Sequence, residues 1–219
     1  MDVFLLDLAQ HEQVLENVRF TQLSAFLARK KTDEHRALVT ALDSERHTRF
    51  VEAWQEFLSA ARPETAGPLA EQPLRTVMSQ RIWKMYKKVV RLGERVRSDS
   101  PPERLHSVRI ACKKLRYLID ASRGLYSARQ SRDALTALKG LQDVLGAFND
   151  RHVQVERIYA WGAEFGRTGE ASAADLIDLG RLTQHLLLEA SELQQAFAGA
   201  FETFASRRNR RKMRSMLND

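Results

Sequence analysis

Residues 74–124 decide the fold of this chain, and they read LRTVMSQRIWKMYKKVVRLGERVRSDSPPERLHSVRIACKKLRYLIDASRG. The stretch holds two apolar rows, the first made of Ile82, Met85, Val89, Leu92 and Val96 and the second of Leu105, Val108, Cys112, Leu115 and Ile119. A recurrence every three or four residues places each row on one face of an α-helix. Between them, Ser100-Pro-Pro-Glu103 has the pattern of a capping box with proline in the first turn. The spacing therefore predicts two helices, over residues 74–98 and from this box to Gly124, packed as an antiparallel pair.

The same helical period continues along most of the remaining chain. It predicts a helical stretch over residues 3–31, with or without a break, and helices over residues 32–61, 132–148, 150–165 and 171–206, so the expected fold class is all-α. In the second of these, the side chains expected to face inward are Leu38, Leu42, Phe50, Trp54, Phe57 and Leu58. Residues 62–73 hold three of the five prolines and are the predicted linker. The basic run over residues 207–214 is expected to fray.

Composition narrows the class of protein. The 219 residues are 43% hydrophobic and 29% charged, which is ordinary for a globular domain, and 10 Gly and 5 Pro are too few for a turn-rich β fold. No run of about 18 uncharged apolar residues exists, and the N-terminus has no basic region typical of a signal peptide. We therefore expect a cytoplasmic protein without a membrane contact. The single cysteine, Cys112, excludes an internal disulfide and a multi-cysteine metal site.

The net charge of +7 is distributed unevenly along the chain. Residues 1–74 carry a net charge of −4, residues 75–132 carry +12, and residues 133–219 carry −1. A uniformly basic chain would attract polyanions weakly and generally. A charge of +12 in one middle segment instead indicates a defined place where a polyanion binds.

The cations of this segment form two stripes beside the two apolar rows. The first stripe consists of Arg81, Lys84, Lys88, Arg91 and Arg95, and the second stripe consists of His106, Arg109, Lys113 and Arg116. Neither stripe contains an acid, although like-charged neighbours at this spacing cost about 0.2–0.5 kcal/mol each. A summed cost of about 1–3 kcal/mol favours a binding surface over a merely solvated face, which stays the alternative. Antiparallel packing is expected to turn both stripes toward one groove.

The residue types indicate what such a groove would bind. Arginine grips phosphate oxygens through two parallel hydrogen bonds, and lysine supplies a mobile point charge. The stripes contain no aromatic side chain, and the neighbouring Tyr117 offers only one ring. Single-stranded nucleic acid is usually bound on successive stacking rings. The pattern therefore favours a phosphate polymer or a highly phosphorylated small molecule, and nucleic acid remains the alternative ligand.

Two motifs resemble those of the CHAD-domain family. They are His106-x2-Arg109-x3-Lys113-x2-Arg116-Tyr117 and the stretch Lys139-Gly-Leu-Gln142-Asp143-Val-Leu-Gly146-Ala-Phe-Asn149-Asp150. The resemblance is close over residues 74–165 and loose elsewhere. It implies two pseudo-symmetric helical bundles that bind inorganic polyphosphate in a central basic channel, without catalysis, and association with polyphosphate granules. The implied channel residues are Lys84, Lys88, Arg91, His106, Arg109, Lys113, Arg116 and Lys139, with Arg81, Lys87, Arg95 and Tyr117 as further candidates.

The chain departs from the family pattern at its start. By the resemblance, Met1-Asp2-Val3 corresponds to Arg151-His152-Val153 of the second half, so we expect that the motif helix of the first half is missing. Either the start is assigned too far downstream or the chain is a shortened natural form. The expected domains are residues 1–73 as the rest of the first bundle with the linker, 74–206 as the second bundle, and 207–219 as a basic tail.

Other residues that suggest chemistry receive plainer interpretations. Five histidines, namely His11, His35, His47, His152 and His185, have no histidine at i+3 or i+4, so we expect surface or core residues and no metal. His106 is expected to be a conditional cation that strengthens binding as the pH falls. The four acids of residues 75–132 are scattered, which argues against an enzyme and against a cofactor. The remaining alternative is an accessory phosphate-binding module that serves a separate triphosphate-processing enzyme, because CHAD domains are often fused to such enzymes.

Overall fold

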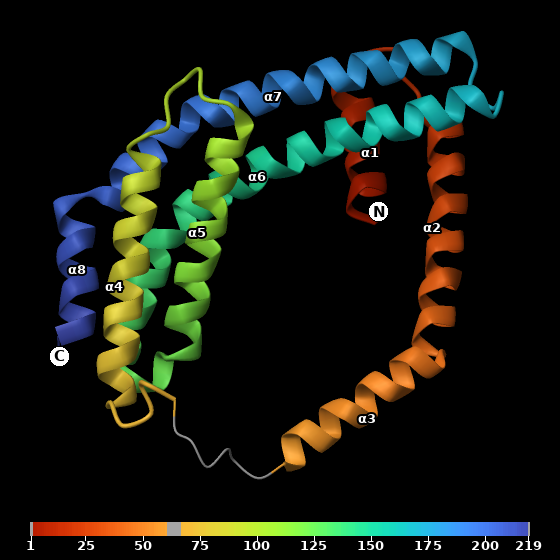
Figure 1. Ribbon diagram of the computed structural model, residues 1–219. Helices are drawn as coiled ribbons and strands as arrows, with labels where there is room; N and C mark the ends of the chain where they lie inside the picture. The colour runs from red at the N-terminus through yellow and green to blue at the C-terminus, as the bar shows by residue number, and fades with distance from the viewer. Residues whose placement is uncertain (1, 61–66, 219) are drawn as a thin grey trace. The chain divides into compact units, whose positions relative to one another are not determined.

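The computed structural model describes residues 2–60 and 67–218, and side chains from residue 8 onward (Figure 1). Its helices are α1 (Asp2–Val14), α2 (Thr21–Leu42), α3 (Glu45–Ser59), α4 (Leu74–Gly93), α5 (Pro102–Ala121), α6 (Ala128–Arg167), α7 (Ala173–Ala205) and α8 (Arg207–Asn218). A 3-10 turn, η1 (Arg123–Leu125), follows α5, and no strand occurs in these ranges. The all-α prediction is confirmed. None of these helices is both long enough and apolar enough to cross a membrane.

The chain divides into two compact units. The first unit draws on residues 1–66 and 154–185, and the second on residues 67–153 and 186–219. Each of the helices α6 and α7 contributes one part to the first unit and another part to the second unit. The expected division at residue 73 assigned both helices wholly to the second bundle. The portion over residues 154–185 belongs to the first unit. The sequence of a helix with a continuous apolar period does not show which other helix each of its turns will contact.

The second unit is built on the antiparallel pair α4 and α5, which lie side by side (Figure 1). Ile82 and Val89 of α4 are fully buried, as are Leu105, Val108, Cys112, Leu115 and Ile119 of α5. The cluster is completed by Leu138, Leu141 and Leu145 of α6, Phe197 and Phe204 of α7, and Met213 and Met216 of α8. The two apolar rows of the sequence are therefore the core of this unit.

The turn between α4 and α5 does not form the expected capping box. Pro101 takes the N-cap position and Pro102 the first helical position of α5. The Ser100 hydroxyl accepts a hydrogen bond from the Arg97 backbone N–H at 2.8 Å instead of capping the helix. The end of α4 lies close to α7, because a Cβ added at Gly93 would come within 2.1 Å of the Phe201 ring. Only glycine allows this approach.

Two expected helix boundaries are wrong. Residues 31 and 32 lie within the unbroken α2, and Asn149-Asp150 lies within the 40-residue α6. The breaks fall instead at residues 15–20 and at Asp43-Ser44, where the Ser44 side chain accepts a hydrogen bond from His47 N–H of α3. The basic run that was expected to fray forms α8, because Met213 and Met216 share one face of it and are buried. The predicted linker lies partly outside the described residues, and its remainder over residues 67–73 forms exposed turns.

The core of the first unit lies around α1, α2 and the parts of α6 and α7 that belong to it. Its buried side chains include Leu8, Val18, Phe20, Leu23, Phe26, Leu27, Trp161, Phe165, Leu179 and Leu182. The Phe26 and Phe165 rings lie 5.3 Å apart. Lys30 Nζ pairs with Glu164 Oε2 at 2.8 Å and Arg181 donates to the Glu16 carbonyl at 2.8 Å, so polar contacts close the edges of this core.

The apolar side chains at the end of α2 and along α3 do not face inward. Trp54 is 52% exposed and Phe57 is 68% exposed, and their rings stack on each other at 5.5 Å. Leu38, Leu42, Phe50 and Leu58 are exposed as well, and α3 buries no residue. The inward prediction for these six side chains is therefore wrong. An amphipathic period shows which face of a helix is apolar but does not supply a partner for it.

Candidate functional site

Four cations on the solvent-facing side of α4, Arg81, Lys84, Lys88 and Arg91, form what we call the α4 stripe together with Arg95, which lies two residues beyond the end of the helix. All five cations of the stripe are exposed. The spacing of the four cations within α4 follows from the helix, since steps of three and four residues return to the same face while Ile82, Tyr86 and Val89 occupy the opposite one. None of the five forms a salt bridge with any residue in the part of the chain that the structure describes. No acid among the described residues therefore neutralises their positive charge through a salt bridge.

A groove runs between this stripe and α5. It is lined by Arg81, Lys84 and Lys88 of α4 and by Lys114 and Tyr117 of α5. Met85 and Leu118 supply the apolar part of its lining. No acid lines the groove, and Tyr117, at 59% exposed, presents its ring at the surface. The arrangement brings four cations and one aromatic ring around a single concave surface.

Lys114 belongs to this groove, and sequence reasoning did not select it. The second stripe of cations, His106, Arg109, Lys113 and Arg116, is called the α5 stripe because all four lie on that helix. Its members follow the buried row of α5 by one residue, a position that Lys113 occupies and Lys114 does not. The two lysines differ by about 100° around the helix. Which flank of α5 meets α4 is decided by the hand of the packing, and no local signal in the sequence reports that hand.

The α5 stripe lies on another side of α5. Its members His106, Lys113 and Arg116 are exposed and Arg109 is half-buried, and none of them lines the groove. His106 Nδ1 lies 3.0 Å from Asn149 Oδ1 of α6, so the stripe begins on the flank of α5 that is nearer to α6. The expectation that both stripes face one groove is therefore wrong. The surface consists of a groove between α4 and α5 and a second row of cations beyond it on α5.

Some of the cations implied by the resemblance have acidic partners. Lys139 Nζ lies 2.6 Å from Asp143 Oδ2, one turn away on α6. Arg116 Nε lies 3.4 Å from Asp120 Oδ2, and the same carboxylate pairs with Arg123 at 2.6 Å, as the spacing of Asp120 and Arg123 predicts. Such exposed pairs are weak. Because a carboxylate lies beside each of them, Lys139 and Arg116 should nevertheless attract a bound anion less strongly than the groove lysines, which have no acidic partner among the described residues.

The helix α8 adds a fixed basic element on the other flank of α4. The guanidinium groups of Arg214 and Arg210 lie 5.0 and 5.9 Å from the centroid of the Trp83 ring. Cation–π contacts at this distance hold the two arginines against α4. Lys87, the further candidate of α4 that lies outside the stripe, is exposed and does not line the groove.

Cys112 takes no part in this surface. Its side chain is fully buried in the core, and burial raises the pKa of the thiol to about 12. A thiol that stays protonated is a poor nucleophile and a poor metal ligand. The residue therefore acts as a small apolar side chain, as its position in the second buried row predicts.

Comparison with models of protein families shows to which family the chain belongs. The family model of the CHAD domain matches residues 1–159. This chain belongs to the CHAD-domain family. The match covers the α4–α5 pair of this CHAD protein, the groove between the two helices and the greater part of α6. No curated protein matches the chain.

Proposed function

We propose that this CHAD protein binds inorganic polyphosphate on the basic surface of the α4–α5 pair and does not catalyse a reaction there. One observation carries the proposal: Arg81, Lys84, Lys88 and Lys114 line one groove that contains no acid, and none of them has a salt-bridge partner among the residues described. Membership of the CHAD family supports a polyphosphate-related function. The proposal adds where the polymer binds and which side chains hold it.

The dimensions of the surface suit a linear polyanion. From Arg81 to Arg91 the α4 stripe extends over about 15 Å of helix axis, with its cations on successive turns, and Arg95 follows just beyond the end of the helix. A flexible chain that carries one charge on each repeating unit can neutralise several of these cations together, releasing their counterions. A single phosphate group would contact one or two of them and gain far less. The stripe thus favours a long ligand over a small one.

The side-chain chemistry favours phosphate over nucleobases. Tyr117 is the one ring in the groove, whereas proteins that bind single strands without sequence preference stack successive bases on several rings. The ring can contribute one contact to a base, and this contact makes nucleic acid the competitor to test. Lysine and arginine alone suffice for a polymer that has no bases.

The proposal that binding is non-catalytic rests on where the acids lie. Hydrolysis or transfer of phosphate needs carboxylates that hold a divalent metal beside the phosphate grip. Among the acids of residues 75–132, Glu94, Asp99 and Glu103 lie near the turn between α4 and α5 and Asp120 pairs with arginines, and none lines the groove. We expect long-chain polyphosphate to be recovered intact after incubation with the protein and Mg²⁺.

A competition titration tests the proposed ligand. Long-chain polyphosphate and single-stranded RNA, matched in phosphate concentration, compete for the full chain at about 0.15 M salt. We expect a clear preference for polyphosphate. Equal affinities would replace the proposal with a general basic groove that also serves nucleic acid, and binding of neither would overturn it.

A charge-reversal pair tests the proposed place. Lys88→Glu reverses an unpaired cation in the groove, and Arg46→Glu reverses an exposed cation on α3 as the matched control. Loss of one charged contact and its replacement by a repulsive one should weaken polyphosphate binding at least about tenfold for Lys88→Glu. The control should change affinity less than about twofold. Equal effects would show that only the net charge of the protein matters.

A further inference from the structure

The groove between α4 and α5 has one part that a bare phosphate polymer does not use. Tyr117 of α5 is 59% exposed and lines the groove beside its four cations. Met85 and Leu118 form an apolar floor next to them, and both side chains pack against the buried core of the second unit. Cations alone suffice for phosphate, whereas an exposed ring above an apolar floor suits the flat face of a nucleobase.

The antiparallel packing of the two helices arranges the ring and the cations in order along the groove (Figure 1). Tyr117 follows Lys114 by about one turn of α5, so the ring lies toward the Arg81 end of the groove and Lys114 toward the Lys88 end. From Arg81 to Lys88 the groove cations of α4 extend over about 10 Å of helix axis. A ligand whose base lies on the ring can therefore continue with phosphates toward Lys88.

The size and charge of the groove suit a small phosphorylated ligand. Its volume of about 690 Å³ falls within the range of about 300–1,000 Å³ that is usual for pockets that bind small molecules. None of its four cations has a salt-bridge partner in the described part of the chain, so a bound phosphate group would displace no acid.

We infer that the groove also binds a nucleoside polyphosphate, with its base stacked on Tyr117 and its row of phosphates held by Lys84, Lys88 and Lys114. The inference rests on the proposed function, since it gives the same phosphate-binding groove a second class of ligand. One ring accommodates one base, and the neighbouring cations accommodate phosphates that follow one another directly. Single-stranded RNA carries a base with every phosphate and would leave all but one of its bases without a ring.

The lining also decides which form of the nucleotide binds. Mg²⁺ that is held between a protein and phosphate groups takes carboxylate ligands, and no acid lines this groove. Here the lysines themselves neutralise the phosphate charge. The free nucleotide should therefore bind more tightly than its Mg²⁺ complex, which carries less negative charge. An affinity that rises when Mg²⁺ is added would contradict this assignment.

A comparison of two ligands with the same number of phosphates tests the role of the ring. ATP and inorganic tripolyphosphate are each titrated into the full chain by calorimetry, at about 0.15 M salt and without Mg²⁺. Stacking of one base should make ATP bind at least about fivefold more tightly, although tripolyphosphate carries more charge. Equal affinities would overturn this inference and leave the proposed function standing, whereas binding of neither tripolyphosphate nor long-chain polyphosphate would remove both.

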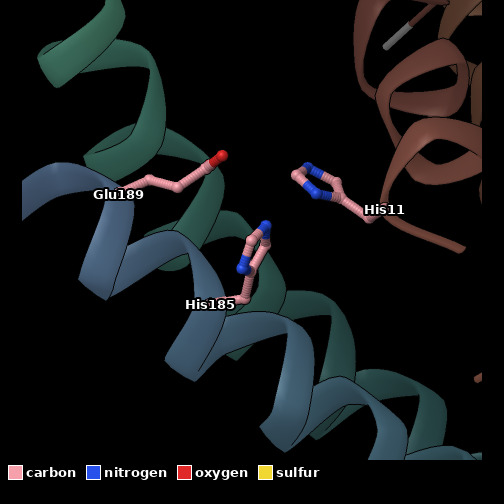
Figure 2. Close-up of side chains that lie close together, drawn as sticks. All are labelled: His11, His185 and Glu189. Carbon is pink, nitrogen blue, oxygen red and sulfur yellow. The ribbon is translucent and has the colours of Figure 1, made fainter. Parts of the chain in front are cut away.

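The titrations are run at about pH 8, so that histidine side chains do not add positive charge elsewhere on the chain. Two of them, His11 of α1 and His185 of α7, meet edge to face in the first unit, with ring centroids 5.2 Å apart (Figure 2). At lower pH, imidazole rings take up protons and attract phosphate groups. A nucleotide bound in that way would not report on the groove.

Three tyrosine variants separate the ring from its surroundings. Tyr117→Ala removes the ring and should bring the ratio of ATP affinity to tripolyphosphate affinity to about one. Tyr117→Phe keeps the ring and should keep the ratio. Tyr159→Ala is the matched control, because Tyr159 of α6 is 64% exposed and does not line the groove, and it should also keep the ratio. An unchanged ratio in Tyr117→Ala, or an equal loss in Tyr159→Ala, would contradict the base site.

Two further measurements address the phosphates and the alternative ligand. Lys88→Glu should weaken ATP and tripolyphosphate alike, by at least about tenfold, because both place phosphates on this lysine. A single-stranded RNA tetramer, whose three phosphates are separated by nucleosides, should bind less tightly than ATP. Equal or tighter binding of the tetramer would assign the ring to nucleic acid and overturn the inference. Circular dichroism of each variant confirms that a changed affinity does not come from unfolding.

Discussion

Lys113 and Lys114 are neighbours in the chain, and both are exposed, yet they face different surfaces. Lys114 lines the groove with Lys84 and Lys88, whereas Lys113 lies outside that lining, in the stripe that includes His106. The angle of about 100° between consecutive helical residues is the whole cause of this difference. The pair therefore offers a test in which residue type, exposure and sequence context are matched.

If the groove is the principal binding surface, reversing Lys114 should be the more damaging change. We expect Lys114→Glu to weaken polyphosphate binding at least about tenfold, since it places a negative charge among the groove cations. Lys113→Glu should weaken it by a smaller factor, measured by the same titration at one salt concentration. A larger effect at Lys113 would move the principal contact to the α5 stripe.

Cys112 gives a prediction for the core of the second unit. Because burial raises the pKa of its thiol to about 12, the folded protein should not react with a disulfide reagent near pH 8, and the denatured protein should release one equivalent per chain. The unfolded thiol ionises near its ordinary value of 9.0, so the stability linked to this group is fully present below pH 9. That stability falls as the pH rises from about 9 toward 12. Rapid labelling of the native protein would contradict the packing of α5.

At the scale of the element, α4 and α5 are stable for a different reason from α3. The paired helices bury two complete apolar rows against α6, α7 and α8. The helix α3 buries no residue and keeps its stacked Trp54 and Phe57 at the surface. Helix stability in proteins comes mostly from packing of the apolar face, so the same kind of side chain should contribute very differently in the two places.

A pair of phenylalanine truncations measures this difference. Phe204 of α7 is 1% exposed, and Phe204→Ala should lower the free energy of unfolding by about 3–5 kcal/mol, because it removes buried area and leaves a cavity. Phe57→Ala should change that free energy by less than about 0.5 kcal/mol, since the side chain already meets solvent. Chemical denaturation of both variants supplies the comparison. A large loss for Phe57→Ala would mean that the face of α3 is covered in solution.

At the scale of the whole molecule, the charge is concentrated rather than spread. The segment over residues 75–132 carries a net charge of +12 in a chain whose total is +7, and the preceding segment is acidic. Charge gathered on one pair of helices raises the local concentration of a polyanion there. The same concentration makes binding depend strongly on ionic strength.

We expect polyphosphate affinity to fall steeply with salt. If about six phosphates are neutralised, log K should fall with log[salt] at a slope near −4, which is roughly a 250-fold weakening between about 0.05 and 0.2 M salt. Lys88→Glu should make the slope shallower by about one unit, and Arg46→Glu should leave it unchanged. A slope near −1 for the parent protein would indicate one or two contacts and would not fit a groove with a stripe.

Much of the molecule could be predicted from the sequence. The apolar rows of α4 and α5, the stop near Gly124, the exposure of every cation in the two stripes except the half-buried Arg109, and the all-α class follow from the local period of each helix. These features depend on residues within a few turns of one another, where helix geometry alone relates sequence to position. The predicted i,i+3 pair of Asp120 and Arg123 is of the same kind.

The rest was decided only by the tertiary structure. It placed Lys114 rather than the α5 stripe in the groove, joined residues 128–167 into one helix, folded α8 against α4 and brought His11 to His185. It also left the apolar face of α3 exposed. Each of these outcomes depends on which partner a helix meets and on which flank, and such contacts join residues that lie dozens of positions apart. The apolar period of a helix shows which of its faces will be buried if a partner is present, whereas only the packing shows which element lies against that face.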